Sequence, residues 1–224
     1  MINSYPKYTI FRFSKKQKKY LLIKRIMDIF LSLFLIIVLS PILLVVGVWV
    51  RIDTGENPIF KQKRPGYHRE IFTIYKFKTM MSNTTLNGKN LSDDERMTKS
   101  GRFLRKTSID ELPQLLNILK GEMSFIGPRP FLINDLGSYN YEQLIRFEVL
   151  PGITSWTAIH GRNNIPIQEK YNYEIYYVKN IRFLLDLKIF LKTIFLVLSQ
   201  KNVNDNVNSK RIGAEICEDD KATE

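Results

Sequence analysis

Residues 29–50 read IFLSLFLIIVLSPILLVVGVWV, a run of 22 residues without a charged side chain. As an α-helix, at about 1.5 Å per residue, this run would extend roughly 33 Å, enough to cross the hydrocarbon core of a bilayer. Ser40-Pro41 lies near its middle, where a proline removes a backbone donor and clashes with the preceding turn. The run therefore predicts a membrane helix with a sharp kink, each half of which reaches only about 15 to 18 Å.

Both flanks of this run are basic. Residues 1–25 contain eight Lys and Arg and no acid, which accounts for eight of the formal net charge of +12. The segment after the run is also rich in cations, namely Arg51, Lys61, Lys63, Arg64 and Arg69. The positive-inside rule leaves one side of a single span poor in Lys and Arg. A re-entrant hairpin with both ends in the cytoplasm satisfies that rule better, although an ordinary spanning helix with a tolerated proline is an alternative on these residues alone.

Charge and cysteine content indicate the partners and the compartment. A basic arm directly before an apolar run meets anionic lipid headgroups more often than nucleic acid, at roughly 1 kcal/mol per residue near the surface. We therefore expect membrane lipids and no nucleic acid as partners. The single cysteine, Cys217, excludes an intrachain disulfide and fits a reducing cytoplasm. The apolar run is too long for a signal peptide and lacks a small-residue cleavage site, so we expect it to stay in the mature protein.

The length of 224 residues suits one membrane element and one globular domain. We predict a basic arm at 1–25, a re-entrant membrane helix at 26–50 that is broken at Ser40-Pro41, a cytoplasmic domain at 51–200 and a polar, disordered tail at 201–224. Short β-type segments on either side of Pro65-Gly66 predict a small β-hairpin. The expected fold class is α+β and mainly helical.

Two further segments carry helical signals. Leucines at 112, 115, 116 and 119 follow helical spacing, so we expect a helix of about three turns that begins near Ser108 and stops at Gly121. Residues 171–198 are rich in Tyr, Phe, Ile and Leu, with charges at intervals. That pattern predicts amphipathic helices along a membrane interface, although the aromatic residues could equally form a core. Residues 82–100 are polar and predict a loop that could close over a ligand.

Residues 107–114 read TSIDELPQ and place two carboxylates, Asp110 and Glu111, side by side. One carboxylate can attack phosphorus while its neighbour holds a divalent metal such as Mg²⁺. A simpler interpretation is a capping box, in which Ser108 caps a helix and Glu111 reaches back to it. Both roles can coexist, because a helix N-terminus presents unpaired N–H groups that attract phosphate.

Cations lie near this pair in the sequence. Arg102, Arg105 and Lys106 precede it, and Arg129 follows between two prolines in a stiff turn, so a phosphate could be held bidentately. The only histidines, His68 and His160, have no partner at metal-ligand spacing, which argues against zinc. The sequence has no Walker loop and no dinucleotide fingerprint.

Several motifs, taken in order and spacing, resemble one family, the bacterial sugar transferases, or monotopic phosphoglycosyl transferases. The matching residues cover roughly 20–200 and are Lys24-Arg25 with Asp28, Ser40-Pro41, PIFKQKRPG at 58–66, KFKTM at 76–80, Asp110-Glu111, GPRP at 127–130, PGIT at 151–154, Gly161-Arg162 and the segment from Tyr177 to Asp186. The resemblance implies a re-entrant Ser-Pro helix with both termini in the cytoplasm, at the inner membrane of a bacterium.

The resemblance also implies a reaction, in which sugar 1-phosphate passes from a UDP-sugar to a polyprenol phosphate, with undecaprenyl phosphate the first candidate. Asp110 would be the nucleophile of an aspartyl-phosphosugar intermediate, with loss of UMP, and Glu111 would help Asp110 to place Mg²⁺. For the substrates, the implied contacts are Lys76 near the active site, Arg105, Arg129 and Arg162 on phosphate or nucleotide, and Asp186 paired with Arg162. The oligomeric state stays open, with a homodimer as one option.

Two departures and two competing functions remain at this stage. Where the family often shows KFRSM this chain has Lys78 and Thr79, and Ser155 replaces a glycine after PGIT. These changes bear on donor recognition, because Lys cannot copy the planar fork of Arg. A non-enzymatic membrane anchor with a basic binding surface is one alternative, and a phosphotransferase that acts on a phospholipid with a CDP donor is another. The sugar and the glycan pathway cannot be read from these residues.

Overall fold

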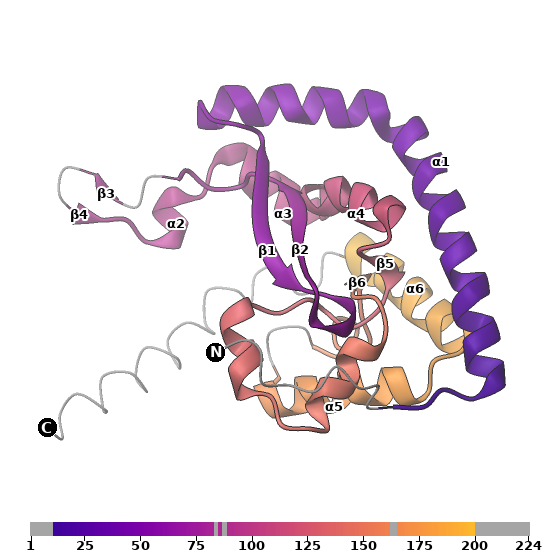
Figure 1. Ribbon diagram of the computed structural model, residues 1–224. Helices are drawn as coiled ribbons and strands as arrows, with labels where there is room; N and C mark the ends of the chain where they lie inside the picture. The colour runs from indigo at the N-terminus through magenta and orange to yellow at the C-terminus, as the bar shows by residue number, and fades with distance from the viewer. Residues whose placement is uncertain (1–10, 83–84, 87–88, 162–164, 200–224) are drawn as a thin grey trace, which may run out of the picture.

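The structure is a computed structural model that describes residues 11–82, 85–86, 89–161 and 165–199. Within those ranges the chain is mainly helical and contains three two-stranded sheets, which confirms the expected α+β class (Figure 1). The longer elements are α1 (Lys15–Thr54), β1 (Ile59–Pro65), β2 (Ile71–Phe77), α3 (Lys99–Thr107), α5 (Ile167–Lys179) and α6 (Phe183–Leu198). The shorter ones are η1 (Tyr67–Arg69), β3 (Thr85–Leu86), β4 (Lys89–Asn90), α2 (Asp93–Arg96), η2 (Ile109–Gln114), α4 (Leu115–Lys120), β5 (Ser124–Ile126), η3 (Ile133–Ser138), η4 (Gln143–Glu148) and β6 (Gly152–Thr154).

Helix α1 is 40 residues long and bends sharply once along its length (Figure 1). It contains Pro41, which has no N–H to donate to the carbonyl of Ile37 four residues earlier. The Ser40 hydroxyl donates to that carbonyl instead, at 2.8 Å, so the Ser-Pro pair bends the helix and still satisfies its backbone. The predicted kink is therefore present, but the helix continues through it and does not break.

Much of α1 is apolar and exposed. Phe30 and Leu44 are 69% and 72% exposed. In the part of the chain that the structure describes, α1 is the helix that is long and apolar enough to cross a membrane. Its residues 15–25 belong to the basic arm, so this part of the arm and the apolar segment form one continuous helix that starts from a capping box at Ser14 and Gln17.

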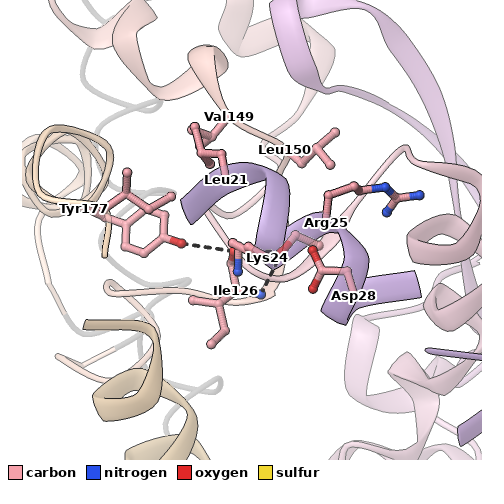
Figure 2. A pocket seen from close by; sticks show the side chains of 10 residues that line it. Leu21, Lys24, Arg25, Asp28, Ile126, Val149, Leu150 and Tyr177 are labelled. Atoms are coloured by element: carbon pink, nitrogen blue, oxygen red, sulfur yellow. Dashed lines mark hydrogen bonds between the residues drawn. The ribbon is translucent and has the colours of Figure 1, made fainter. Parts of the chain in front are cut away.

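The N-terminal half of α1 is docked on the rest of the protein through buried charges. Lys24 Nζ lies 2.8 Å from Asp186 Oδ2 on α6, and Asp28 Oδ1 accepts a hydrogen bond from the backbone of Phe125 at 3.2 Å. Figure 2 shows Lys24 and Asp28 beside Ile126 of β5 and Tyr177 of α5. Two of the basic residues near the membrane segment therefore make internal contacts, because Arg25 also donates to the Ile118 carbonyl at 2.7 Å.

Strands β1 and β2 form the predicted hairpin, which pairs antiparallel from Ile59 opposite Phe77 to Pro65 opposite Ile71. One face of β2 buries Phe72 and Ile74 against Leu115 and Ile118 of α4. The hairpin thereby fixes the position of η2, which directly precedes α4. A second pairing, between β5 and β6, is parallel and was not predicted.

Two expectations need correction. The segment predicted as a loop at 82–100 is not a loop throughout, because β3, β4 and α2 lie within it and α3 begins at its end. The helix expected from Ser108 to Gly121 is instead the 3₁₀ segment η2 followed by the short α4, although Gly121 does end it in a left-handed conformation with φ 90°. Pro113 within η2 lacks the N–H that a regular α-helix would need there.

The apolar run at 171–198 forms two helices, α5 and α6. Leu185 and Ile189 of α6 are buried in the main core with Val178 of α5. Leu184 and Phe195 on the same helix are 68% and 63% exposed. The core expectation for this run is therefore confirmed in part, because α6 contributes to the core. Its exposed apolar side chains leave the position at a membrane interface a prediction.

Candidate active site

Lys76 reaches the site from the end of the β-hairpin. It lies two residues after Ile74 and four after Phe72, so strand alternation places it on the face that packs against η2 and α4. Its Nζ lies 2.7 Å from Glu111 Oε1. The row of apolar contacts along β2 therefore continues into an ion pair with the first turn of η2.

The junction between α3 and η2 presents the two carboxylates. Ser108 has φ 57° and ends α3, with its N–H directed to the Arg105 carbonyl at 3.3 Å. It makes no side-chain cap to η2, and a capping residue needs extended backbone. The capping-box interpretation of Asp110-Glu111 is therefore wrong, and the Glu111 carboxylate pairs with Lys76. The helix-terminus argument for phosphate binding weakens as well, since η2 is a six-residue 3₁₀ segment.

Arg105 comes from the last turn of α3. Its Nε donates to Thr79 Oγ1 at 3.0 Å, and its Nη2 lies 3.2 Å from Met80 Sδ. The approach of α3 to Thr79 depends on Gly101, because a Cβ there would lie 2.0 Å from the Thr79 carbonyl oxygen. The KFKTM motif and α3 are thus locked together, and Arg105 is held near Asp110.

Electrostatics single out Asp110. Burial and the neighbouring Glu111 raise the pKa of its carboxyl from 3.8 to about 6, against the opposing effects of Lys76 and Arg105. One pKa unit corresponds to a tenfold ratio, so the carboxylate form still prevails at neutral pH. The site therefore contains an anion that is poorly solvated, repelled by a second anion and flanked by two cations, which is a suitable environment for a nucleophile.

The repulsion between the Asp110 and Glu111 carboxylates would favour binding of a metal ion. Described residues form no cluster of three or more His, Cys, Asp and Glu side chains that would enclose an ion. Mg²⁺ needs fewer protein ligands, because it keeps several waters and binds through one or two carboxylates together with substrate phosphates. Glu111 raises the pKa of Asp110, and a divalent cation would relieve that repulsion. The donor set fits Mg²⁺ shared with a substrate.

Comparison with known proteins identifies the family. A profile described as bacterial sugar transferase matches residues 19–200. The chain belongs to the bacterial sugar transferase family. An uncharacterized sugar transferase of Bacillus subtilis, EpsL, is 45% identical over 183 residues, which cover 82% of this chain and 91% of that protein.

Other bacterial sugar transferases are longer. An undecaprenyl-phosphate galactose phosphotransferase of Salmonella typhimurium is 34% identical over 203 residues, with 83% of this chain and 42% of that protein covered. A UDP-glucose:undecaprenyl-phosphate glucose-1-phosphate transferase of Escherichia coli is 36% identical over 186 residues, with 78% and 40% covered. This chain therefore spans less than half the length of these two proteins.

The departures from the bacterial sugar transferase motifs have structural counterparts. Thr79 keeps the hydroxyl that a serine would offer and uses it to accept from Arg105. Lys78 pairs with Glu56, just after the end of α1, at 2.6 Å. Ser155 is buried and accepts from the backbone of Ala158 at 2.9 Å. Each of these three residues therefore makes an internal contact.

The structure brings together four of the predicted site residues, namely Lys76, Arg105, Asp110 and Glu111. Arg129 lies on a separate turn after β5, with an exposed side chain. Arg162 falls outside the described residues, so its pairing with Asp186 stays a prediction. Asp186 is 5% exposed and has other partners, because it pairs with Lys24 and accepts from the hydroxyls of Tyr20 at 2.6 Å and Tyr177 at 2.9 Å. That environment favours a structural role for Asp186.

Sequence reasoning missed Thr79 as the residue that orients Arg105. It also missed Glu174 and Arg146, which contact the backbone of Arg129. The hydroxyl of Thr79 was visible as a variant of a family motif, and that signal could have identified it. Glu174 and Arg146 had no local signal, because each looks like an ordinary charge on a helical segment until the fold buries it.

Proposed function

We propose that this chain transfers sugar 1-phosphate from a UDP-sugar to a polyprenol phosphate, with undecaprenyl phosphate as the first candidate acceptor, and releases UMP. The reaction would form a lipid-linked diphosphosugar for a bacterial surface glycan. The names of relatives in Salmonella typhimurium and Escherichia coli, which are undecaprenyl-phosphate sugar transferases, support this class of reaction.

The observation that carries the proposal is the setting of Asp110. Its carboxyl has a pKa of about 6, lies beside Glu111 and is influenced by Lys76 and Arg105 from two other segments. A carboxylate that has lost part of its hydration attacks more readily, and cations near it stabilise charge that develops on a phosphoryl group. A purely structural carboxylate would be more stable in a close ion pair. In the described part of the chain, Asp110 forms no ion pair within 4.0 Å with Lys76 or Arg105.

In the first step, a carboxylate oxygen of Asp110 attacks the phosphorus that carries the sugar. The new bond is an acyl phosphate, and the bond between that phosphorus and the bridging oxygen of UMP breaks, so UMP leaves with the electron pair. Arg105 and Lys76 would stabilise the phosphoryl oxygens as charge spreads over them. The hydrogen bond from Arg105 to Thr79 keeps this guanidinium in place.

In the second step, an oxygen of the polyprenol phosphate attacks the same phosphorus. The acyl phosphate bond breaks, and the Asp110 carboxylate is restored with the charge it had at the start. Two displacements let one site handle a soluble donor and a lipid acceptor in turn. Glu111, which lies 2.7 Å from Lys76 Nζ before substrate binds, would limit the movement of that cation.

Mg²⁺ would be held by Glu111 and Asp110 together with substrate phosphate. When bound, it would neutralise charge on the diphosphate.

We further propose that α1 enters the membrane and returns to the cytoplasmic face of the bacterial inner membrane, so that both termini stay in the cytoplasm. The sharp bend of α1 and its exposed apolar side chains support this topology. The uncovered apolar side of α6, with Leu184 and Phe195, would lie on the same membrane surface. The active site would then be close to the headgroups of the lipid acceptor.

The experiment that tests the reaction measures UMP release by the detergent-solubilised full chain with Mg²⁺, undecaprenyl phosphate and a panel of UDP-sugars. We expect release with at least one donor, dependent on the lipid and lost in Asp110→Asn. A phosphosugar bound covalently to the wild-type chain, but not to Asp110→Asn, should be detected by mass spectrometry when the lipid is omitted.

Two results would contradict the proposal. CMP release from a CDP donor, with no UMP from any UDP-sugar, would identify a phospholipid phosphotransferase. Salt-sensitive DNA binding by folded protein that binds no nucleotide sugar would favour the basic anchor.

A further inference from the structure

The turn that carries Arg129 has all its backbone hydrogen-bonding groups occupied. Pro128 accepts from the Gly152 N–H at 2.9 Å, and Pro130 accepts from Arg64 Nη1 at 3.3 Å. The Arg129 N–H donates to Glu174 Oε2 at 3.1 Å, and its carbonyl accepts from the guanidinium of Arg146. Because the two prolines have no N–H, these four bonds account for every donor and acceptor at residues 128–130.

Two of these partners are deeply buried charges. Glu174 is 1% exposed and also accepts from the Thr157 hydroxyl at 2.7 Å. Arg146 is 3% exposed, lies 3.9 Å from the centre of the Phe131 ring and donates to the Tyr139 hydroxyl at 2.9 Å. Buried charges are costly, and well-packed apolar residues often stabilise a fold more. Stability alone therefore gives a poor explanation for placing both charges beside one short turn.

The turn itself is built to be held closely. Gly127 and Gly152 approach each other so tightly that a Cβ on Gly152 would lie 2.1 Å from the Gly127 nitrogen. This contact joins the GPRP motif to the PGIT motif through the parallel pair of β5 and β6. Arg129, whose backbone is fixed on both sides, nevertheless leaves its side chain exposed.

Arg64, which donates to the carbonyl of Pro130, brings a second guanidinium to the same turn. Arg129 lowers the pKa of Arg64, after the larger effect of burial, and it lowers the pKa of Lys170 in the same way. Like charges repel one another, and an anion bound between these cations would reduce the repulsion. A phosphate group, which accepts bidentate hydrogen bonds from Arg, matches this arrangement.

We infer that Glu174 and Arg146 are positioning residues that hold Arg129, beside Arg64, as a binding site for a phosphate group of one substrate. The identity of those substrates rests on the proposed function. The phosphate could come from the nucleotide or from the polyprenol phosphate, since both offer the same oxygens. The hydrogen bonds from Glu174 and Arg146 to Arg129 are to its backbone, so both residues would act on the substrate through the position of Arg129.

The test measures binding and requires no turnover. Dissociation constants for UMP, inorganic phosphate and undecaprenyl phosphate are determined on the detergent-solubilised full chain for wild type, Arg129→Ala, Glu174→Met and the double variant. We expect Arg129→Ala and Glu174→Met each to weaken one substrate ligand about tenfold, while Glu174→Met in the Arg129→Ala background adds less than about twofold. UMP as the affected ligand would assign the nucleotide phosphate, and undecaprenyl phosphate would assign the lipid.

Two further variants separate positioning from folding. Glu174→Gln should restore binding, because its amide oxygen can accept from Arg129 and its amide nitrogen can donate to Thr157. If Glu174→Met does not fold, Arg146→Lys serves instead, since lysine cannot bond both Tyr139 and the Arg129 carbonyl. Lys179 lies on the same helix as Glu174 and forms an exposed ion pair with Glu142. Lys179→Met removes that pair and should leave binding unchanged.

An equal loss from Glu174→Met with and without Arg129 would overturn the inference, as would unchanged binding of all three probes by Arg129→Ala. Failure of the proposed function would look different. In that case no UDP-sugar would yield UMP, whatever the binding data show for Arg129.

Discussion

Asp110 and Asp186 are both aspartates near cations, but their surroundings have opposite effects on the carboxylate. Asp186 accepts from Tyr20 and Tyr177 and pairs with Lys24, so its charge is compensated on all sides. Asp110 sits beside a second carboxylate, and burial and that neighbour raise its pKa to about 6. Three helices, α1, α5 and α6, meet at Asp186, whereas the residues around Asp110 lie at the ends of elements.

The difference shows how burial separates structure from chemistry. A buried charge that has its full set of partners stabilises one arrangement of α1 against α5 and α6 and has little tendency to react. A buried charge with incomplete compensation costs stability but keeps its reactivity. Sequence alone placed both aspartates in the predicted site, and only their surroundings separate them.

The largest effect should come from Asp110→Asn. Because asparagine cannot form the acyl phosphate, we expect kcat for UMP release to fall at least about 10⁴-fold, which corresponds to more than about 5 kcal/mol. Steady-state assays with the donor identified for the wild type would measure this. Asp186→Asn, corrected for the folded fraction, should keep most of the activity, and equal losses in the two variants would remove the contrast.

Lys24→Met should act on stability. Removal of one partner of a buried ion pair leaves Asp186 uncompensated, at a cost of about 3 to 5 kcal/mol. Thermal unfolding in detergent should show a clearly lower Tm than wild type. Lys19→Met removes an exposed cation from the same helix and is the matched control, for which we expect no comparable change.

Asp110→Asn should raise stability at neutral pH. The folded-state pKa of about 6 exceeds the unfolded value of 3.8, so the stability that the protonated form provides is present below pH 3.8 and is lost as pH rises through 6. At roughly 1.36 kcal/mol per unit, the lost stability is about 3 kcal/mol at pH 7. Melting curves should show the variant more stable at pH 7.5, with the gap closing toward pH 4. A gap that does not depend on pH would contradict this.

The smallest effect is a shift in pH dependence. The free enzyme needs Asp110 ionised, so kcat/KM for the donor should fall as pH drops below about 6. Glu111→Gln removes a repelling charge and should move this limb to lower pH, while Lys76→Met removes a cation and should move it to higher pH. We expect displacements of up to about one unit. Shifts in the same direction would exclude Asp110 as the titrating group.

Local signals were enough for several parts of the fold. The kink at Ser40-Pro41, the hairpin turn at Pro65-Gly66 and the helix stop at Gly121 were all predicted, because each depends on residues a few positions apart. The predicted capping role of Ser108 was wrong, although it also rested on residues a few positions apart. The motif was local, but α3 ends there in a left-handed conformation that the pattern does not reveal.

The site divides in the same way. The residue types near Asp110-Glu111 indicated phosphate chemistry, and the order of motifs indicated the family, since both are properties of the chain itself. The Lys76–Glu111 pair joins residues 35 positions apart, and the bond from Tyr20 to Asp186 joins residues 166 positions apart. The spacing of residue types along the sequence does not predict contacts over such separations.

The sequence by itself therefore determined the long apolar segment, the hairpin, the candidate site residues and the family. Only the tertiary structure decided which charges would be neutralised and which would stay reactive. It made Lys24 and Arg25 internal contacts, gave Asp186 a full set of partners and left Asp110 with too few. The physical reason is that solvation and Coulomb energy depend on distances in space, and folding sets those distances between segments that are remote along the chain.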